Sequence, residues 1–166
     1  SGKVAQIDRT AKLYVGGAQK RPDSGYSFAV THKGRVVGLA GLGNRKDIRN
    51  AVEAAHGAKS WGKATGHNRA QVLYYLAENL AQREAEFAAR LRDAVVPKAA
   101  DEVAASIRRA FWYAAQADKY DGAVHSTKSS HVTLAMPEPY GAIGIACPTD
   151  APLLGFLSLV LPAIAM

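Results

Sequence analysis

The fold of this chain is decided by residues 138–153, whose sequence is EPYGAIGIACPTDAPL. Residues 142–146 form a short, continuous apolar run, which is typical of a buried parallel strand. Pro148, Thr149 and Asp150 then form a polar turn, and Pro152 is placed to open a helix. Ligands of open α/β sheets bind at the turns that follow the carboxyl ends of strands. The stretch therefore predicts the first strand of a nucleotide-binding sheet, its ligand-binding turn and the next helix.

The preceding residues predict short strands followed by three helices. The strands are expected at 13–15, 28–30 and 35–39. Asn44 should cap the first helix, Asn68 should cap a second helix that reaches Leu91, and a third should span 101–121 and stop at Gly122. Residues 126–136 read as extended because apolar residues alternate there. The predicted fold class is α/β, with a sheet that has only begun.

Composition narrows the possible partners. The chain has 166 residues, of which 48% are hydrophobic and 21% charged, as in a soluble globular domain. The net charge of +7 has two interpretations. It can attract nucleic acid, or it can reflect a surplus of surface lysine and arginine on a soluble enzyme. Because no basic block reaches five residues and no aromatic residues are interleaved with basic ones, we expect no nucleic-acid partner.

Three further features bear on location. Residues 151–166 carry no charge but fall short of the about 20 residues that a membrane-spanning helix needs, so no membrane partner is expected. The single cysteine excludes an intramolecular disulfide, which favours the cytoplasm. The first residues have no apolar signal core.

Four groups of residues resemble the aldehyde dehydrogenase superfamily. They are LYVGG at 13–17, the spacing of Arg69, Leu73, Leu76 and Leu80, YAAQADKYDG at 113–122, and the stretch 138–153, where the family has Glu-Pro-x-Gly, an apolar strand and Pro-Trp-Asn-Phe-Pro-Leu. The resemblance implies that 1–166 is the early part of a Rossmann-type cofactor domain. Within it, 124–136 would belong to the oligomerisation strand pair, and 142–166 would be the first Rossmann strand and its helix. The catalytic domain would be absent.

The resemblance also implies an activity, the oxidation of an aldehyde to a carboxylic acid with NAD or NADP. The cofactor would contact Ala146, Cys147, Pro148 and Thr149, mainly through the backbone, and no metal is implied. The family's nucleophilic cysteine, its glutamate base and its cofactor-binding lysine lie beyond the matched segment. We interpret Cys147 as a buried strand residue that behaves as a small hydrophobe.

Asp150 is the sharpest departure from the family. It stands at the position of the asparagine whose amide donates to the oxyanion, and an ionised carboxylate has only acceptors. Thr149 and Ala151 replace the flanking Trp and Phe. One hypothesis is that the chain comes from a degenerate copy, a pseudoenzyme, of a large two-copy member. The alternative is a tolerated variation in an active enzyme.

The sequence thus predicts a fragment of an aldehyde-dehydrogenase-like oxidoreductase that is not catalytic by itself. A non-catalytic oligomerisation module is the alternative, and a basic nucleic-acid binder is a third, disfavoured one. The apolar helix at 153–164 and the strand at 132–136 are expected to lack covers. We therefore expect Met166 to be a truncated end, and the partner to be a second copy, as in a homo-oligomer, or the rest of a parent enzyme.

Overall fold

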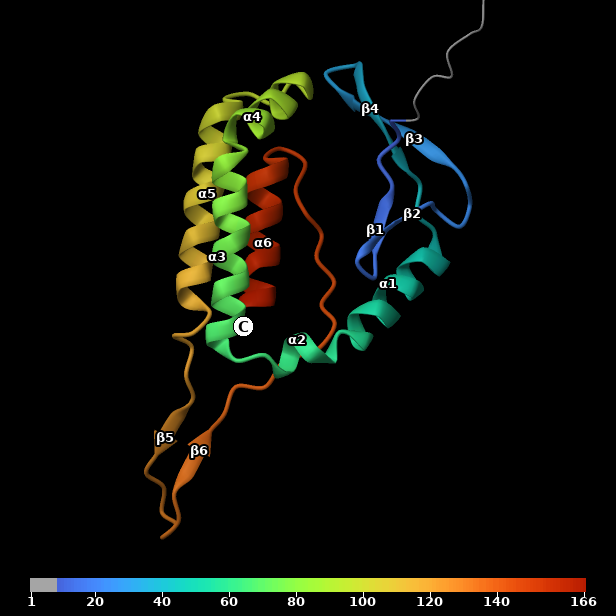
Figure 1. Ribbon diagram of the computed structural model, residues 1–166. Helices are drawn as coiled ribbons and strands as arrows, with labels where there is room; N and C mark the ends of the chain where they lie inside the picture. The colour runs from blue at the N-terminus through green and yellow to red at the C-terminus, as the bar shows by residue number, and fades with distance from the viewer. Residues whose placement is uncertain (1–8) are drawn as a thin grey trace, which may run out of the picture. The chain divides into compact units, whose positions relative to one another are not determined.

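The computed structural model describes residues 9–166 and divides into two compact units. The first runs to Gly57 and includes Asp93–Val95, and the second comprises Ala58–Arg92 and Val96–Met166. Strands dominate the first unit and helices the second (Figure 1). The α/β fold class predicted from the sequence is confirmed.

The first unit contains two β-hairpins. β1 (Leu13–Val15) pairs with β2 (Ala18–Lys20), and β3 (Ser27–His32) pairs with β4 (Arg35–Gly41), both antiparallel. Gly16 and Gly17 have φ of 63° and 79°, the left-handed values that a two-residue hairpin turn requires. The strands expected at 13–15, 28–30 and 35–39 are confirmed.

Helix α1 (Arg45–Gly57) begins as its sequence predicts. The backbone amides of Lys46 and Asp47 donate to Asn44 Oδ1 at 2.8 and 3.2 Å, and the Asn44 amide donates to Asp47 Oδ2 at 2.9 Å. This reciprocal capping satisfies amides that have no partner inside the helix. Lys46 also donates to the carboxylate of Asp23, and this hydrogen bond lowers the pKa of Asp23.

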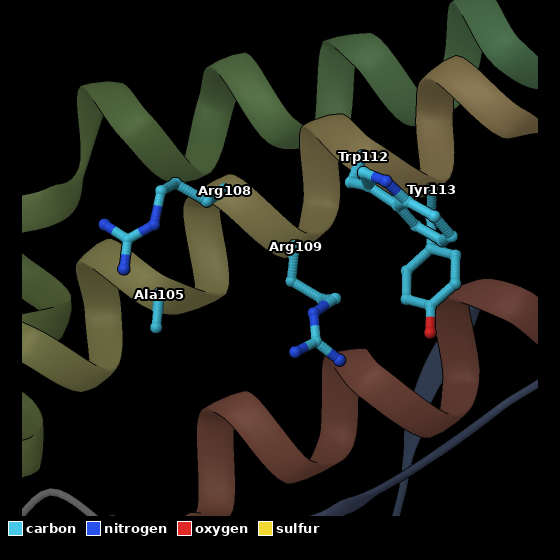
Figure 2. Close-up of a pocket in the computed structure, with 5 residues that line it drawn as sticks. All are labelled: Ala105, Arg108, Arg109, Trp112 and Tyr113. Atoms are coloured by element: carbon cyan, nitrogen blue, oxygen red, sulfur yellow. The ribbon is translucent and has the colours of Figure 1, made fainter.

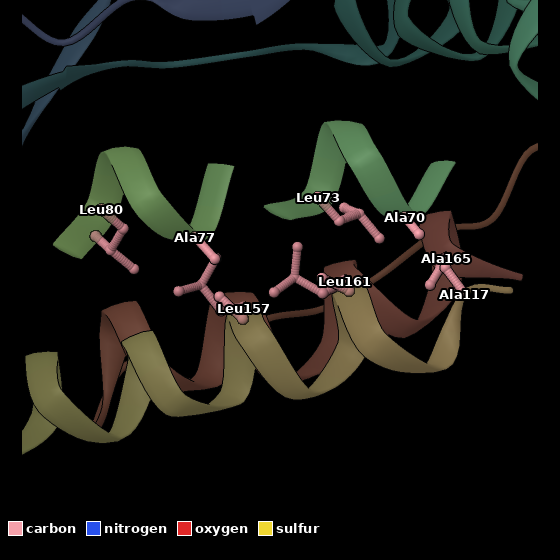
Figure 3. Close-up of a cluster of buried hydrophobic side chains, with 10 residues drawn as sticks. Ala70, Leu73, Ala77, Leu80, Ala117, Leu157, Leu161 and Ala165 are labelled. Carbon is pink, nitrogen blue, oxygen red and sulfur yellow. The ribbon is translucent and has the colours of Figure 1, made fainter. Parts of the chain in front are cut away.

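The core of the second unit lies between three helices, α3 (Gly66–Gln82), α5 (Ala99–Gln116) and α6 (Pro152–Ala165). The two short helices are α2 (Lys59–Lys63) and α4 (Glu84–Asp93). Alanines bring the helix backbones close together, and leucines fill the space between them (Figure 3). The buried cluster consists of Ala70, Leu73, Ala77, Leu80, Ala110, Ala114, Ala117, Leu157, Leu161 and Ala165.

Three helix boundaries differ from the prediction. Thr65, rather than Asn68, caps α3, and its side chain accepts the Asn68 amide at 3.1 Å. The predicted second helix is divided at Arg83 into α3 and α4. The three- and four-residue spacing of apolar residues continues from α3 into α4, so the spacing alone gives no sign of the break. Helix α5 ends at Gln116, and Gly122 is not its stop. Instead, Gly122 lies so close to the Ala135 carbonyl that an added Cβ would be 2.3 Å from it.

The predicted strand at 126–136 is one arm of a short hairpin. β5 (Ala123–His125) pairs antiparallel with β6 (Thr133–Ala135). Both strands are exposed along their whole length, with Val124 at 74% and Leu134 at 58% exposure.

Residues 142–146, which the sequence predicts to be a buried strand, form no strand in the described part of the chain. A buried parallel strand exists only between neighbouring strands, and the described part of the chain places none beside it. Within residues 9–166, no helix is long and apolar enough to cross a membrane.

Candidate functional site

The predicted ligand-binding turn lies immediately before α6. Ala146, Cys147, Pro148, Thr149 and Asp150 are all exposed. The expectation that Cys147 is buried is therefore wrong, because the strand that would bury it does not form. Within residues 9–166 no hydrogen bond joins the Cys147 thiol to a basic side chain, the kind of contact that activates a cysteine nucleophile.

Glu102, on α5, anchors the amino terminus of α6. The amides of Leu153 and Leu154 donate to Glu102 Oε1 at 2.9 and 3.1 Å. These are amides that a helix cannot satisfy internally, and a carboxylate also interacts favourably with the positive end of the helix dipole. Ala151 has no capping side chain, so Glu102 supplies the cap from another helix.

The carboxyl terminus of α6 is held by side-chain nitrogens that donate hydrogen bonds to its last carbonyl groups. Trp61 Nε1 donates to the Ile164 carbonyl at 2.9 Å, and Arg69 Nε donates to the Ala165 carbonyl at 3.0 Å. A second Arg69 nitrogen donates to the Ala64 carbonyl. A positive side chain at this end complements the helix dipole, so both ends of α6 are fixed to the rest of the unit.

A close approach between Pro148 and Gly155 fixes the turn against α6. A Cβ added to Gly155 would lie 2.3 Å from Pro148 Cγ, so only glycine permits this contact. The Gly155 amide donates to the Ala151 carbonyl at 2.7 Å, in the first turn of the helix. The structure thus brings Pro148 to α6 and leaves Thr149 and Asp150 exposed beside it.

Sequence reasoning missed Glu102, Gly155 and the two donors Trp61 and Arg69 as parts of this site. The sequence around 138–153 does not indicate a contact with Glu102, because 51 residues separate Glu102 from Leu153. Gly155 is one of 15 glycines, and nothing local to it indicates a contact with Pro148.

The described residues do not by themselves fit a nicotinamide dinucleotide. The exposed backbone at Ala146–Thr149 offers one wall, and a dinucleotide needs a site that contacts both of its nucleotide halves. No strand lies beside this segment in residues 9–166. The same described part of the chain contains no group of three or more metal-ligating side chains.

The order of the elements defines an α/β chain in which the turn at 146–151 leads directly into α6. The model of the aldehyde dehydrogenase family matches residues 8–166. The chain belongs to the aldehyde dehydrogenase family.

The chain is similar in sequence to several aldehyde dehydrogenases that act on different substrates. The chain is 30% identical to benzaldehyde dehydrogenase [NAD(+)] of Pseudomonas putida over 80% of this chain and 28% of that protein. It is 32% identical to α-ketoglutaric semialdehyde dehydrogenase of Bacillus subtilis over 70% of this chain and 25% of that protein.

A solved structure shows the same fold. Betaine aldehyde dehydrogenase of Staphylococcus aureus, in complex with NAD+, matches with a TM-score of 0.84 and 19% identity, over 93% of this chain and 32% of that one. The chain thus spans about a third or less of the length of these relatives.

Proposed function

We propose that this chain is the early part of the cofactor domain of an aldehyde-dehydrogenase-like oxidoreductase that acts on an aldehyde with NAD or NADP. In this proposal residues 1–166 form a partial cofactor domain, 124–136 contribute to oligomerisation, and 142–166 supply the first sheet segment and its helix. The family match over residues 8–166 carries the proposal. The turn at Ala146–Thr149 would contact the cofactor, and the family's activity would require groups outside the matched segment.

Cofactor binding by the chain alone is expected to be weak or absent, because the turn forms only one wall of a dinucleotide site. Titration calorimetry with NAD+ and NADP+ should show no saturable heat up to about 1 mM, which corresponds to less than about 4 kcal/mol of binding free energy. A micromolar dissociation constant for either dinucleotide would overturn this part of the proposal. Adenosine, which carries no pyrophosphate, is the control for nonspecific heat.

The β5–β6 hairpin supports the second candidate function, an oligomerisation module. Its apolar side chains at Val124, Val132, Leu134 and Met136 are between 58% and 75% exposed, and unpaired strand edges favour pairing with another chain. The sequence-based expectation that α6 also lacks a cover is corrected by the structure. Helices α3 and α5 bury Leu157 and Leu161, so only the outer side of α6 remains open.

We therefore expect self-association through the hairpin. Light scattering at low micromolar concentration should give a mass above the 17.6 kDa of one chain. Replacing Leu134 with lysine should lower that mass, because a charge opposes burial of the strand face. Tyr75→Lys, a control at another exposed residue, should not. A monodisperse mass near 17.6 kDa for the unmodified chain would refute the expectation.

A further inference from the structure

Strand β3, in the first unit, leaves one of its edges without a neighbour. The Leu42 amide donates to the Tyr26 carbonyl at 2.9 Å, so these two residues form a hydrogen-bonded pair across the hairpin. Such pairs alternate along an antiparallel ladder, and Ser27 and Ala29 therefore direct their backbone groups away from β4. Within residues 9–166, no strand pairs with that side of β3.

The opposite edge of the hairpin agrees with this alternation and is occupied. Gly41 and Leu39 of β4 lie opposite Ser27 and Ala29. The Gly41 amide donates to the Ala11 carbonyl at 2.8 Å, and the Ala11 amide donates to the Leu39 carbonyl at 2.9 Å. Ala11 thus satisfies the outward backbone groups of β4, and β3 carries the free edge.

The sequence of β3 does not protect this edge. Edge strands are commonly protected from pairing by charged residues or proline. The strand reads SFAVTH and contains no lysine, arginine, acid or proline, and its register shifts only after Val30. Phe28 and Val30 lie on one face of the strand and are 47% and 39% exposed. An incoming strand would therefore meet free backbone groups beside an apolar face.

The hairpins around this edge are strongly basic. Residues 9–43 hold six lysines and arginines and one acid, Asp23, whose carboxylate accepts a hydrogen bond from Lys46. Within residues 9–166, none of the six cations lies at ion-pair distance from a carboxylate. They are Arg9, Lys12, Lys20, Arg21, Lys33 in the turn after β3, and Arg35 at the start of β4.

The rest of the chain is nearly neutral. Residues 58–166 hold eleven lysines and arginines and ten acids, so almost all of the net charge of +7 lies in residues 1–57. Some cations of the second unit are also used in packing. Arg109 Nη1 lies 3.3 Å from Ser158 Oγ, and Figure 2 shows its side chain reaching toward α6. The unpaired positive charge is therefore concentrated in the part of the chain that contains β3.

We propose that the free edge of β3 binds an extended acidic segment of another protein, which adds an antiparallel strand to the hairpin. The backbone of this segment pairs with Ser27 and Ala29, and its apolar side chains pack beside Phe28. An antiparallel segment begins where β3 ends, so acidic residues at its amino-terminal end meet Lys33 and Arg35. A second copy of this chain fits poorly, because its own basic hairpins would repel these charges. The surface shares no residue with the turn at 146–151 and does not depend on the proposed function.

Fluorescence anisotropy with short labelled peptides tests the proposal on the unmodified chain. The probe begins with two glutamates and continues with alternating valine and threonine. It should bind saturably, and a peptide with two lysines in place of the glutamates should bind at least about fivefold more weakly, as expected for the loss of two exposed charge pairs. Equal binding of the two peptides, or no binding of the acidic peptide up to about 1 mM, would overturn the proposal.

Ala29→Pro tests the backbone pairing. Proline removes the amide that points away from β4 and leaves the hydrogen bonds to β4 in place, so the acidic peptide should bind at least about fivefold more weakly, the equivalent of one hydrogen bond. Ala29→Val keeps the amide and should bind as the unmodified chain does. The Leu42 amide resonance reports whether the hairpin of each variant is intact, because this amide is bonded to Tyr26. Unchanged binding in an intact Ala29→Pro variant would contradict the proposal.

Charge removal tests the acidic end of the segment. Lys33→Gln/Arg35→Gln should weaken binding of the acidic peptide about fivefold or more. Arg90→Gln/Arg92→Gln removes the same charge from exposed positions on α4 and should leave binding unchanged. Equal losses in the two double variants would contradict the assignment. An oligothymidylate that binds as tightly as the acidic peptide, and equally well to Ala29→Pro, would show a general polyanion surface and overturn it. A lower light-scattering mass in Ala29→Pro would make a second copy the occupant and would overturn it too.

Discussion

Replacing Leu161 with alanine is expected to lower the free energy of unfolding of the second unit by about 2 to 5 kcal/mol. Leu161 is 1% exposed, and its side chain fills the space between α3, α5 and α6 (Figure 3). Its removal forfeits apolar burial and leaves a cavity that alanine neighbours are too small to fill. Urea unfolding followed by circular dichroism measures the change.

Leu159→Ala is the matched control. It makes the same chemical change on the same helix, but Leu159 is 41% exposed and belongs to the open side of α6. Leu159→Ala should lower the free energy of unfolding by much less than Leu161→Ala, because part of the Leu159 side chain already contacts water. Equal losses of unfolding free energy at the two positions would show that Leu161 is not buried between α6 and the helices α3 and α5.

The second large effect concerns Asp150. In an active relative that carries the family's asparagine at this position, replacement by aspartate is expected to lower kcat about 100- to 1000-fold. By the family resemblance this asparagine donates to the oxyanion, and an ionised carboxylate both lacks the donor and repels the developing charge. Steady-state formation of reduced cofactor measures the loss.

An alanine variant of the same relative separates the two causes. Alanine removes the donor without adding charge, so aspartate should be at least as damaging as alanine. An aspartate variant that keeps near-normal kcat would support the alternative, in which Asp150 is a tolerated variation in an active enzyme. In that case, aspartate at position 150 would no longer support the hypothesis that the chain comes from a degenerate copy of a two-copy enzyme.

The features that could be predicted from sequence are local ones. Asn44 and Asp47 lie within one turn of each other, so the cap of α1 follows from their identity and spacing alone. The paired glycines at 16 and 17 likewise determine their own turn. The family resemblance rested on motifs of this kind, in their order along the chain, and the family match confirms it.

The features that could not be predicted depend on residues far apart in the chain. The apolar sequence of α6 shows that it needs a cover but not that α3 and α5 provide one. The Glu102 cap and the Trp61 donor reach α6 across long stretches of sequence. Exposure of Cys147 was also missed, because a strand is buried only by neighbouring strands, and an apolar run says nothing of whether they are present.

Formation of reduced cofactor by the purified chain, with a panel of aldehydes and either NAD+ or NADP+, tests the central claim most directly. The only cysteine, Cys147, is exposed, and the position that the family resemblance assigns to the oxyanion asparagine holds Asp150. We therefore predict no increase in reduced-cofactor absorbance above that of a buffer blank. Turnover that disappears when Cys147 is replaced by serine would contradict the claim that this chain is not catalytic by itself.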